Sequence, residues 1–231
     1  IFSERPEAVD IQLADFDGVS YHVCTDPNQR HLLTVSMAWS CYNELRNCGA
    51  DDRLRQIYGN AFTNPETGHD VTLRIDMNQL SDQDKQELPR KIGLLKREAF
   101  AAAFVKMFGT VTAGGQSPMI TINYRTNEAL YLTQNREGVI AIFSVNFKDR
   151  DDVVISKVFL QEFAAGRKSI NNAPSVKFSQ REAPLELQGV QNVREADDQG
   201  FVSFALFSGH ISEGHRDKTI DSLQMFRDYL H

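Results

Sequence analysis

The sequence has 231 residues, of which 41% are hydrophobic and 15 are Phe, and its formal net charge is −6. This composition excludes a disordered chain, and the length suffices for one large domain or two of ordinary size. The acidic balance, without a cluster of Lys and Arg, argues against a nucleic-acid partner or an anionic membrane surface. The apolar runs also fall short of the roughly 20 residues that cross a bilayer.

Cysteine usage indicates a reducing compartment. The chain has three cysteines, and Cys41 and Cys48 fall on a predicted helix, about 10 Å apart along its axis. That separation is too large for a disulfide bond. We therefore predict reduced thiols and a cytoplasmic location.

The first half of the chain predicts three strands, then helices, then one more strand. The strand-like runs are 9–16, 19–24, 32–37 and 71–75. Residues 39–58 predict one or two helices with a break near Gly49. Ser81 to Asp84 is a capping signal, and Pro89, taken as a first-turn residue, predicts a buried helix that reaches about Phe108.

The second half repeats this order after a glycine-rich stretch, 109–118, which is the best candidate for a linker. The predicted strands are 119–124, 129–133, 139–147, 176–179 and 201–207, with a helix over 151–165 and a polar insert around Pro184. A closing amphipathic helix places Ile220, Leu223, Phe226 and Leu230 on one face, with Asp221, Gln224 and Asp228 away from it.

The order of elements predicts an α+β fold made of two tandem similar domains, 1–112 and 113–231. Each domain is expected to have an antiparallel sheet with helices on one face. Runs of strands followed by helices, rather than strict alternation, argue against a doubly wound parallel sheet.

The stretch "ADFDGV" raises a catalytic alternative. An apolar run before D-x-D-G resembles the motif of haloacid-dehalogenase-type phosphatases, with Asp15 as nucleophile and Asp17 as general acid. Such an enzyme needs both carboxylates at the carboxyl end of a parallel strand. Here "VSYHVC" continues as a strand, and two strands separated by Asp-Gly are typical of a hairpin with a type I′ turn. The hairpin is the preferred interpretation.

The residues that could complete a phosphatase site also have a simpler structural explanation. Asp151 and Asp152 could bind magnesium, with Lys148 or Lys157 as the phosphate-binding lysine. Acids before an apolar helix also complement the helix dipole. The six histidines are scattered, and motifs for nucleotide binding or a serine nucleophile are absent from the sequence. The residues alone therefore predict no enzyme, no cofactor and no metal.

Five long stretches carry a resemblance that covers nearly the whole chain. They are "PEAVDIQLADFDGVSYHV", "GADDRLRQIYG", "FKDRDDVVISKVFLQEFAAGRK", "REAPLEL" and "TIDSLQMFRDYLH". They are similar to the family of 34-kDa subunits (subunit 2) of the actin-related protein 2/3 complex. In that family the chain continues as a long basic C-terminal helix, so we expect this helix to be truncated here.

The resemblance implies a non-enzymatic scaffold subunit. In the family, two tandem α/β domains pair with the 20-kDa subunit 4 to form the core of the complex, which lies against the mother actin filament during branched nucleation. The implied partners are subunit 4, the remaining subunits and the actin filament, and the implied location is the actin cytoskeleton, in actin patches and at the cell cortex. A free-standing actin-binding module remains a further alternative.

Site residues are carried over from the family only where the sequence matches. Phe226, Tyr229 and Leu230 are predicted to contact the partner subunit, and the alternative is ordinary packing of this helix on its own sheet. Basic residues are the candidates for filament contact, and the alternative is a solvated surface. They are Lys96, Arg97, Arg167, Lys168 and Arg181. Arg150 interrupts the acidic loop of the family.

Overall fold

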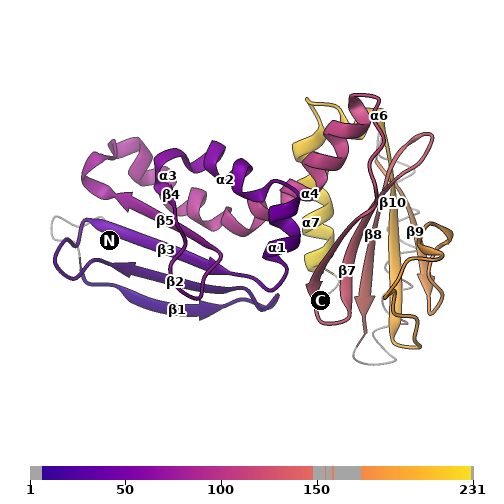
Figure 1. The fold of residues 1–231 in the computed structure, drawn as a ribbon, viewed down its shortest axis with the longest axis horizontal. Helices are drawn as coiled ribbons and strands as arrows, with labels where there is room; N and C mark the ends of the chain where they lie inside the picture. The colour runs from indigo at the N-terminus through magenta and orange to yellow at the C-terminus, as the bar shows by residue number, and fades with distance from the viewer. Residues whose placement is uncertain (1–6, 148–153, 155–157, 159–172, 230–231) are drawn as a thin grey trace. The chain divides into compact units, whose positions relative to one another are not determined.

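The computed structural model describes residues 7–147, 154, 158 and 173–229. They fall into two compact units, Ile1–Ala102 and Ala103–His231. Each unit contains a five-stranded sheet in which all neighbouring strands are antiparallel (Figure 1). The predicted α+β class is thus confirmed, whereas a domain boundary between residues 112 and 113 stays a prediction.

The first sheet has the order β1-β2-β3-β5-β4. Its strands are β1 (Asp10–Ala14), β2 (Ser20–Thr25), β3 (Leu32–Ala38), β4 (Phe62–Thr63) and β5 (Val71–Asp76). The central strands β3 and β5 have apolar residues at alternate or successive positions. Among these, Val35, Met37 and Leu73 are fully or almost fully buried. This alternation is what the sequence uses to predict the strands.

The helices of the first unit lie on one side of its sheet (Figure 1). They are α1 (Tyr42–Asn47), α2 (Ala50–Tyr58) and α3 (Asp82–Gly93), with 3-10 turns η1 (Gly59–Ala61) and η2 (Met77–Gln79) between elements. The predicted break between the first two helices is confirmed, because Gly49 separates them with a φ of +89°. Glycine adopts that left-handed conformation without the steric cost that a side chain brings.

The prediction that Pro89 opens a helix is wrong. Helix α3 begins after Ser81, whose Oγ accepts a hydrogen bond from the Asp84 backbone N–H at 3.1 Å. Pro89 lies inside this helix, where it removes one helical hydrogen bond. The next helix, α4 (Leu95–Thr112), is separate. Its apolar stretch is buried as predicted, with Phe100 and Phe104 at 0% exposure.

The second sheet has the order β6-β7-β8-β10-β9, which matches the first sheet position by position. Its strands are β6 (Ile120–Arg125), β7 (Glu128–Gln134), β8 (Gly138–Asn146), β9 (Ser175–Gln180) and β10 (Gln199–Phe207). In both sheets the last strand pairs with the third and the fourth takes the edge. The predicted architectural repeat is confirmed, although the predicted linker is partly helical, since α4 runs to Thr112.

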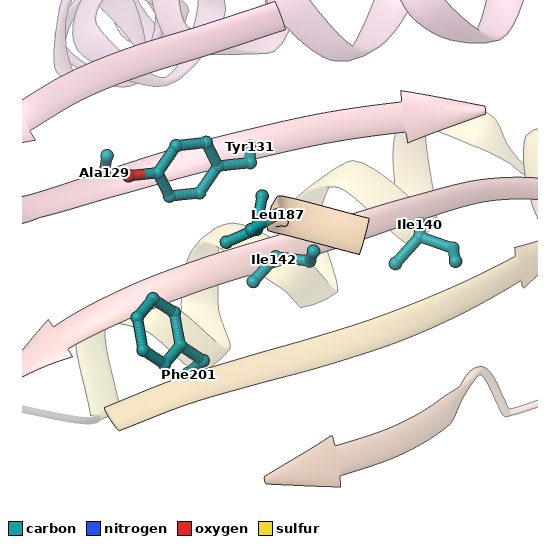
Figure 2. Close-up of a cluster of buried hydrophobic side chains, with 6 residues drawn as sticks. All are labelled: Ala129, Tyr131, Ile140, Ile142, Leu187 and Phe201. Atoms are coloured by element: carbon teal, nitrogen blue, oxygen red, sulfur yellow. The ribbon is translucent and has the colours of Figure 1, made fainter. Parts of the chain in front are cut away.

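Both faces of the second sheet are covered. On one face the helix α7 (Arg216–Tyr229), which follows the short α6 (Ser208–Ile211), packs Phe226 against Phe204 of β10. On the other face the polar insert contributes Leu187, from η4 (Leu185–Leu187), to a buried cluster (Figure 2). Its other members are Ala129, Tyr131, Ile140, Ile142 and Phe201. The sequence predicted helices on one face of the sheet and did not predict this layer on the other face.

Two further expectations concern helices of the second unit. Gln224 was expected on the solvent side of the closing helix, but it is 7% exposed and therefore buried. The predicted helix over 151–165 lies, apart from Val154 and Val158, outside the described residues. Within the described part of the chain, no helix has the length and apolar character needed to cross a membrane.

Candidate functional site

The "DFDG" stretch forms the loop of the β1–β2 hairpin. Ala14 pairs with Ser20, and Asp15 N donates to Val19 O at 2.9 Å. Gly18 N donates to Asp15 O at 3.1 Å, and Gly18 has a φ of +71°. A turn closed by a left-handed glycine in this way is the three-residue hairpin loop, not the predicted type I′ turn. The hairpin is confirmed and the turn type is corrected.

The Asp15 side chain is part of the loop itself. Its Oδ1 accepts hydrogen bonds from the backbone N–H groups of Asp17 and Val19, at 2.9 and 3.0 Å. Asp side chains favour turns for this reason, because they satisfy backbone donors that no strand partner reaches. One carboxylate oxygen is therefore committed to holding the loop closed.

Lys96, from the first turn of α4, forms ion pairs with both aspartates. Its Nζ lies 2.6 Å from Asp15 Oδ2 and also forms an ion pair with Asp17 Oδ2. The side chains of Lys96 and Asp17 are 19% and 3% exposed. The ammonium also lies 5.5 Å from the centre of the Trp39 ring, which suits a cation–π contact. Burial, together with the charges of the two aspartates, raises the pKa of the nearby Tyr21 hydroxyl.

This arrangement contradicts the phosphatase alternative. The two carboxylates sit in a hairpin loop at the edge of an antiparallel sheet, rather than at the carboxyl end of a parallel strand. Both are held by Lys96, and Asp15 also binds backbone donors. The other residues of that hypothesis, Asp151, Asp152, Lys148 and Lys157, lie outside the described residues.

The edge strand β1 presents apolar side chains to solvent. Ile11 is 51% exposed and Leu13 is 48% exposed, and Phe16 in the following loop is 101% exposed. Ile11 and Leu13 are two positions apart, so they lie on the same face of the strand. An exposed edge with this composition is a surface on which another chain can pack.

The predicted partner-contact residues lie at the end of α7. Phe226 is 6% exposed, and its ring meets that of Phe204 edge-on with 4.9 Å between the centroids. Phe226 therefore packs on the sheet of its own unit, as in the alternative to a partner contact. Tyr229 is the last residue of α7, and Leu230 lies outside the described residues. Among the side chains of this helix whose exposure the structure describes, Met225 is a large apolar one that is exposed, at 57%.

The basic candidates for filament contact have different surroundings. The Lys96 side chain is largely buried by its ion pairs, and Arg97 Nη1 donates to Glu98 Oε1 at 2.7 Å. Arg181 is 63% exposed and pairs with Asp197 at 3.0 Å. Arg167 and Lys168 lie outside the described residues. Lys96 and Arg97 belong to the first unit, and Arg181 belongs to the second.

Sequence reasoning missed two features of the first unit. The alternation of 9–16 predicts a strand, yet it does not show that the apolar side of an edge strand faces solvent. The pairing of Lys96 with Asp17 crosses 79 positions, and no local pattern signals it.

Comparison with known proteins agrees with this non-catalytic geometry. A family model described as the Arp2/3 complex 34 kD subunit p34-Arc matches residues 35–231. The chain is 44% identical over 221 residues to actin-related protein 2/3 complex subunit 2 of Dictyostelium discoideum, covering 94% of this chain and 74% of that protein. It is 36% identical over 251 aligned residues to the subunit 2 of Schizosaccharomyces pombe, covering 99% and 79%. The chain therefore belongs to the p34-Arc family of non-catalytic Arp2/3 complex subunits.

Proposed function

We propose that this chain is a structural subunit of an Arp2/3 complex that forms the core of the assembly with the 20-kDa subunit 4 and contacts the mother actin filament. The observation that carries the proposal is the family match over 35–231 together with two relatives named as subunit 2. Such a role places the chain at the actin cytoskeleton, with the other subunits as permanent partners.

The surface of the first unit supports a role in assembly. The apolar side chains of β1 and its loop, Ile11, Leu13 and Phe16, are half or fully exposed. Exposed apolar groups of this kind favour association, because burying them against a partner removes them from water. Hydrogen bonds and ion pairs among Asp15, Asp17 and Lys96 support the loop that carries Phe16.

The end of α7 is the proposed contact for subunit 4. Tyr229 and Leu230 supply the contact in this proposal, whereas Phe226 anchors the helix on Phe204. Aromatic and large apolar residues are enriched at the core of permanent interfaces. Because the helix is already packed on its own sheet, binding of a partner to its final turn costs little conformational entropy.

Among the basic candidates, Arg181 is the best suited to touch the filament. Its ion pair with Asp197 is exposed on both sides, at 63% and 81%, and such pairs contribute little to stability. The guanidinium can therefore exchange this partner for a carboxylate of an acidic filament. Since the chain carries a net charge of −6, a local basic group must provide the attraction. Arg97, Arg167 and Lys168 are further candidates, and Lys96 is the least suited because its charge is already paired.

The test is filament co-sedimentation of the reconstituted complex with Arg181→Glu in this chain. We expect filament affinity to fall roughly threefold to tenfold, which corresponds to about 0.7–1.4 kcal/mol. The matched control is Arg136→Glu, an exposed arginine in the β7–β8 loop, which should change affinity less than twofold. Equal losses in the two variants would remove Arg181 from the contact. A complex that assembles normally but never pellets with filaments would contradict the filament role itself.

A further inference from the structure

A cluster of potential metal ligands lies between the β1–β2 hairpin and the loop that joins β4 to β5. His22 and Cys24 are two positions apart on β2, so both side chains lie on one face of the strand. Glu66, from the β4–β5 loop, reaches the same place. One ligand atom from each of these three residues lies within 4.8 Å of the others.

The spacing of these atoms is close to that of a tetrahedral metal site. The ligand bond lengths of Zn²⁺ place neighbouring ligand atoms about 3.3–3.8 Å apart. His22 Nδ1 lies 3.3 Å from Glu66 Oε2. The Cys24 thiol, within 4.8 Å of both, needs to move by about 1 Å to complete the geometry. A rotation about χ1 supplies a movement of that size.

We propose that His22, Cys24 and Glu66 form a zinc-binding site, with His22 binding the ion through Nδ1. The donor set is one nitrogen, one sulfur and one carboxylate oxygen, which suits Zn²⁺ and disfavours Ca²⁺ or Mg²⁺, since those ions prefer oxygen ligands alone. The side chains of His22 and Glu66 are 20% and 28% exposed, so an ion can enter from solvent.

Neighbouring residues already hold the ligands in place. His22 Nε2 lies 3.1 Å from Asp10 Oδ1. A histidine that binds a metal through one nitrogen commonly donates the other N–H to a carboxylate, and Asp10 fills that role. Ser36 Oγ donates to Glu66 Oε2 at 2.8 Å, and Ser36 in turn is 2.8 Å from Thr72 Oγ1. These contacts orient the ligands before an ion binds.

The charges around the cluster favour a cation. The carboxylate groups of Asp10 and Glu66 both contact His22, at 3.1 and 3.3 Å. Two carboxylates at one place give a negative local potential, which a divalent ion neutralises. Bound zinc would also deprotonate the thiol directly.

A second histidine lies beside the three ligands. The ring of His69 stacks on that of His22, with centroids 5.9 Å apart and planes 24° apart. Its Nδ1 is buried and has no hydrogen-bond partner within the part of the chain that the structure describes. Histidines that look scattered in the sequence are thus brought together, and in this proposal a water molecule takes the fourth position. Zinc at this site would tie the hairpin to the β4–β5 loop.

The experiment uses the reconstituted complex with the full-length chain, stripped with a chelator and then loaded with Zn²⁺ or Co²⁺. We expect one more zinc ion per complex than in the matched complex carrying Cys24→Ser, measured by mass spectrometry of the metal. Co²⁺ should give thiolate-to-metal charge-transfer absorption, which Cys24→Ser abolishes. Cys48→Ser, a half-buried cysteine at the end of α1, should leave both signals unchanged.

Two further variants keep the proposal testable if Cys24→Ser fails to assemble. Asp10→Asn changes a side chain that is 81% exposed and should weaken zinc binding about 10-fold to 100-fold, as loss of an orienting partner does. Glu66→Gln should weaken it at least tenfold. The proposal is overturned if the unmodified complex binds no additional zinc, or if the cobalt–thiolate absorption persists in Cys24→Ser.

Discussion

Lys96 Nζ lies 2.6 Å from Asp15 Oδ2, although the two residues are 81 positions apart in the sequence. The contact joins the first turn of α4 to the β1–β2 loop, and the same ammonium pairs with the buried Asp17. A motif that looks catalytic in the sequence is therefore a connection between two elements of one unit.

Lys96→Met should destabilise the first unit. The change removes the Lys96 ammonium from the carboxylate of Asp17, which is 3% exposed, and removal of one partner of a buried ion pair costs about 3–5 kcal/mol. Urea unfolding followed by the fluorescence of Trp39, the single tryptophan, reports on this unit. Lys91→Met, an exposed lysine of the same unit, is the control and should shift the midpoint little. Equal midpoints for the two variants would show that the ion pairs contribute nothing.

Gly18→Ala should cost about 1–2 kcal/mol, because Gly18 has a φ of +71° and a residue with a side chain is strained there. The added methyl group has open space, since nothing lies within 4 Å of it. The change in stability therefore reports backbone strain and not a steric clash. Gly214→Ala, also in open space but without a positive φ, should be neutral or slightly stabilising. Thermal unfolding of the two variants measures the difference. If both variants melt together, the left-handed turn is not what requires glycine.

Leu13→Lys should reduce self-association of the isolated chain. Leu13 is 48% exposed on an edge strand, where unpaired backbone groups invite another strand, and a lysine on such an edge opposes this pairing. Met225→Lys is the matched control, because Met225 is similarly exposed, at 57%, but lies on a helix. Light scattering over a concentration series should show clearly less self-association for Leu13→Lys and little change for Met225→Lys. An equal reduction in the two variants would indicate that general surface hydrophobicity, rather than the edge strand, causes the self-association.

Arg194→Gln should raise the pKa of Asp198. Arg194 Nη2 donates to Asp198 Oδ1 and Oδ2 at 2.7 and 2.8 Å, and this hydrogen bonding lowers the pKa of the carboxyl group. Because the folded-state pKa is the lower one, the pair stabilises the fold above the unfolded-state value of about 3.9 and loses its effect as the pH falls through the folded-state value. A carboxyl-carbon NMR titration of both proteins measures the shift. An unchanged Asp198 pKa would show that the contact does not form in solution.

The sequence predicted most elements because their patterns are local. Apolar runs predicted each described strand except β4 (Phe62–Thr63), whose two residues are too few to show a pattern, and Gly49 marked the break between α1 and α2. Pro89 misled because a proline inside a helix is indistinguishable in sequence from one at its start. The layer around Leu187 was missed because its apolar residues are too widely spaced to show a period.

The sites were harder to predict than the fold. The ion pairs of Lys96 and the cluster around His22 each join residues more than 40 positions apart, and such contacts follow from the strand order rather than from any spacing. The exposure of Ile11 and Leu13 also depends on β1 being at an edge, which the pattern of one strand cannot reveal.

Co-expression of this chain with the 20-kDa subunit, followed by size-exclusion chromatography with light scattering, tests the proposed function most directly. We expect a stable one-to-one heterodimer that assembles with the remaining subunits into a complex able to branch actin filaments. A well-behaved monomer that elutes apart from the 20-kDa subunit would contradict the proposed function.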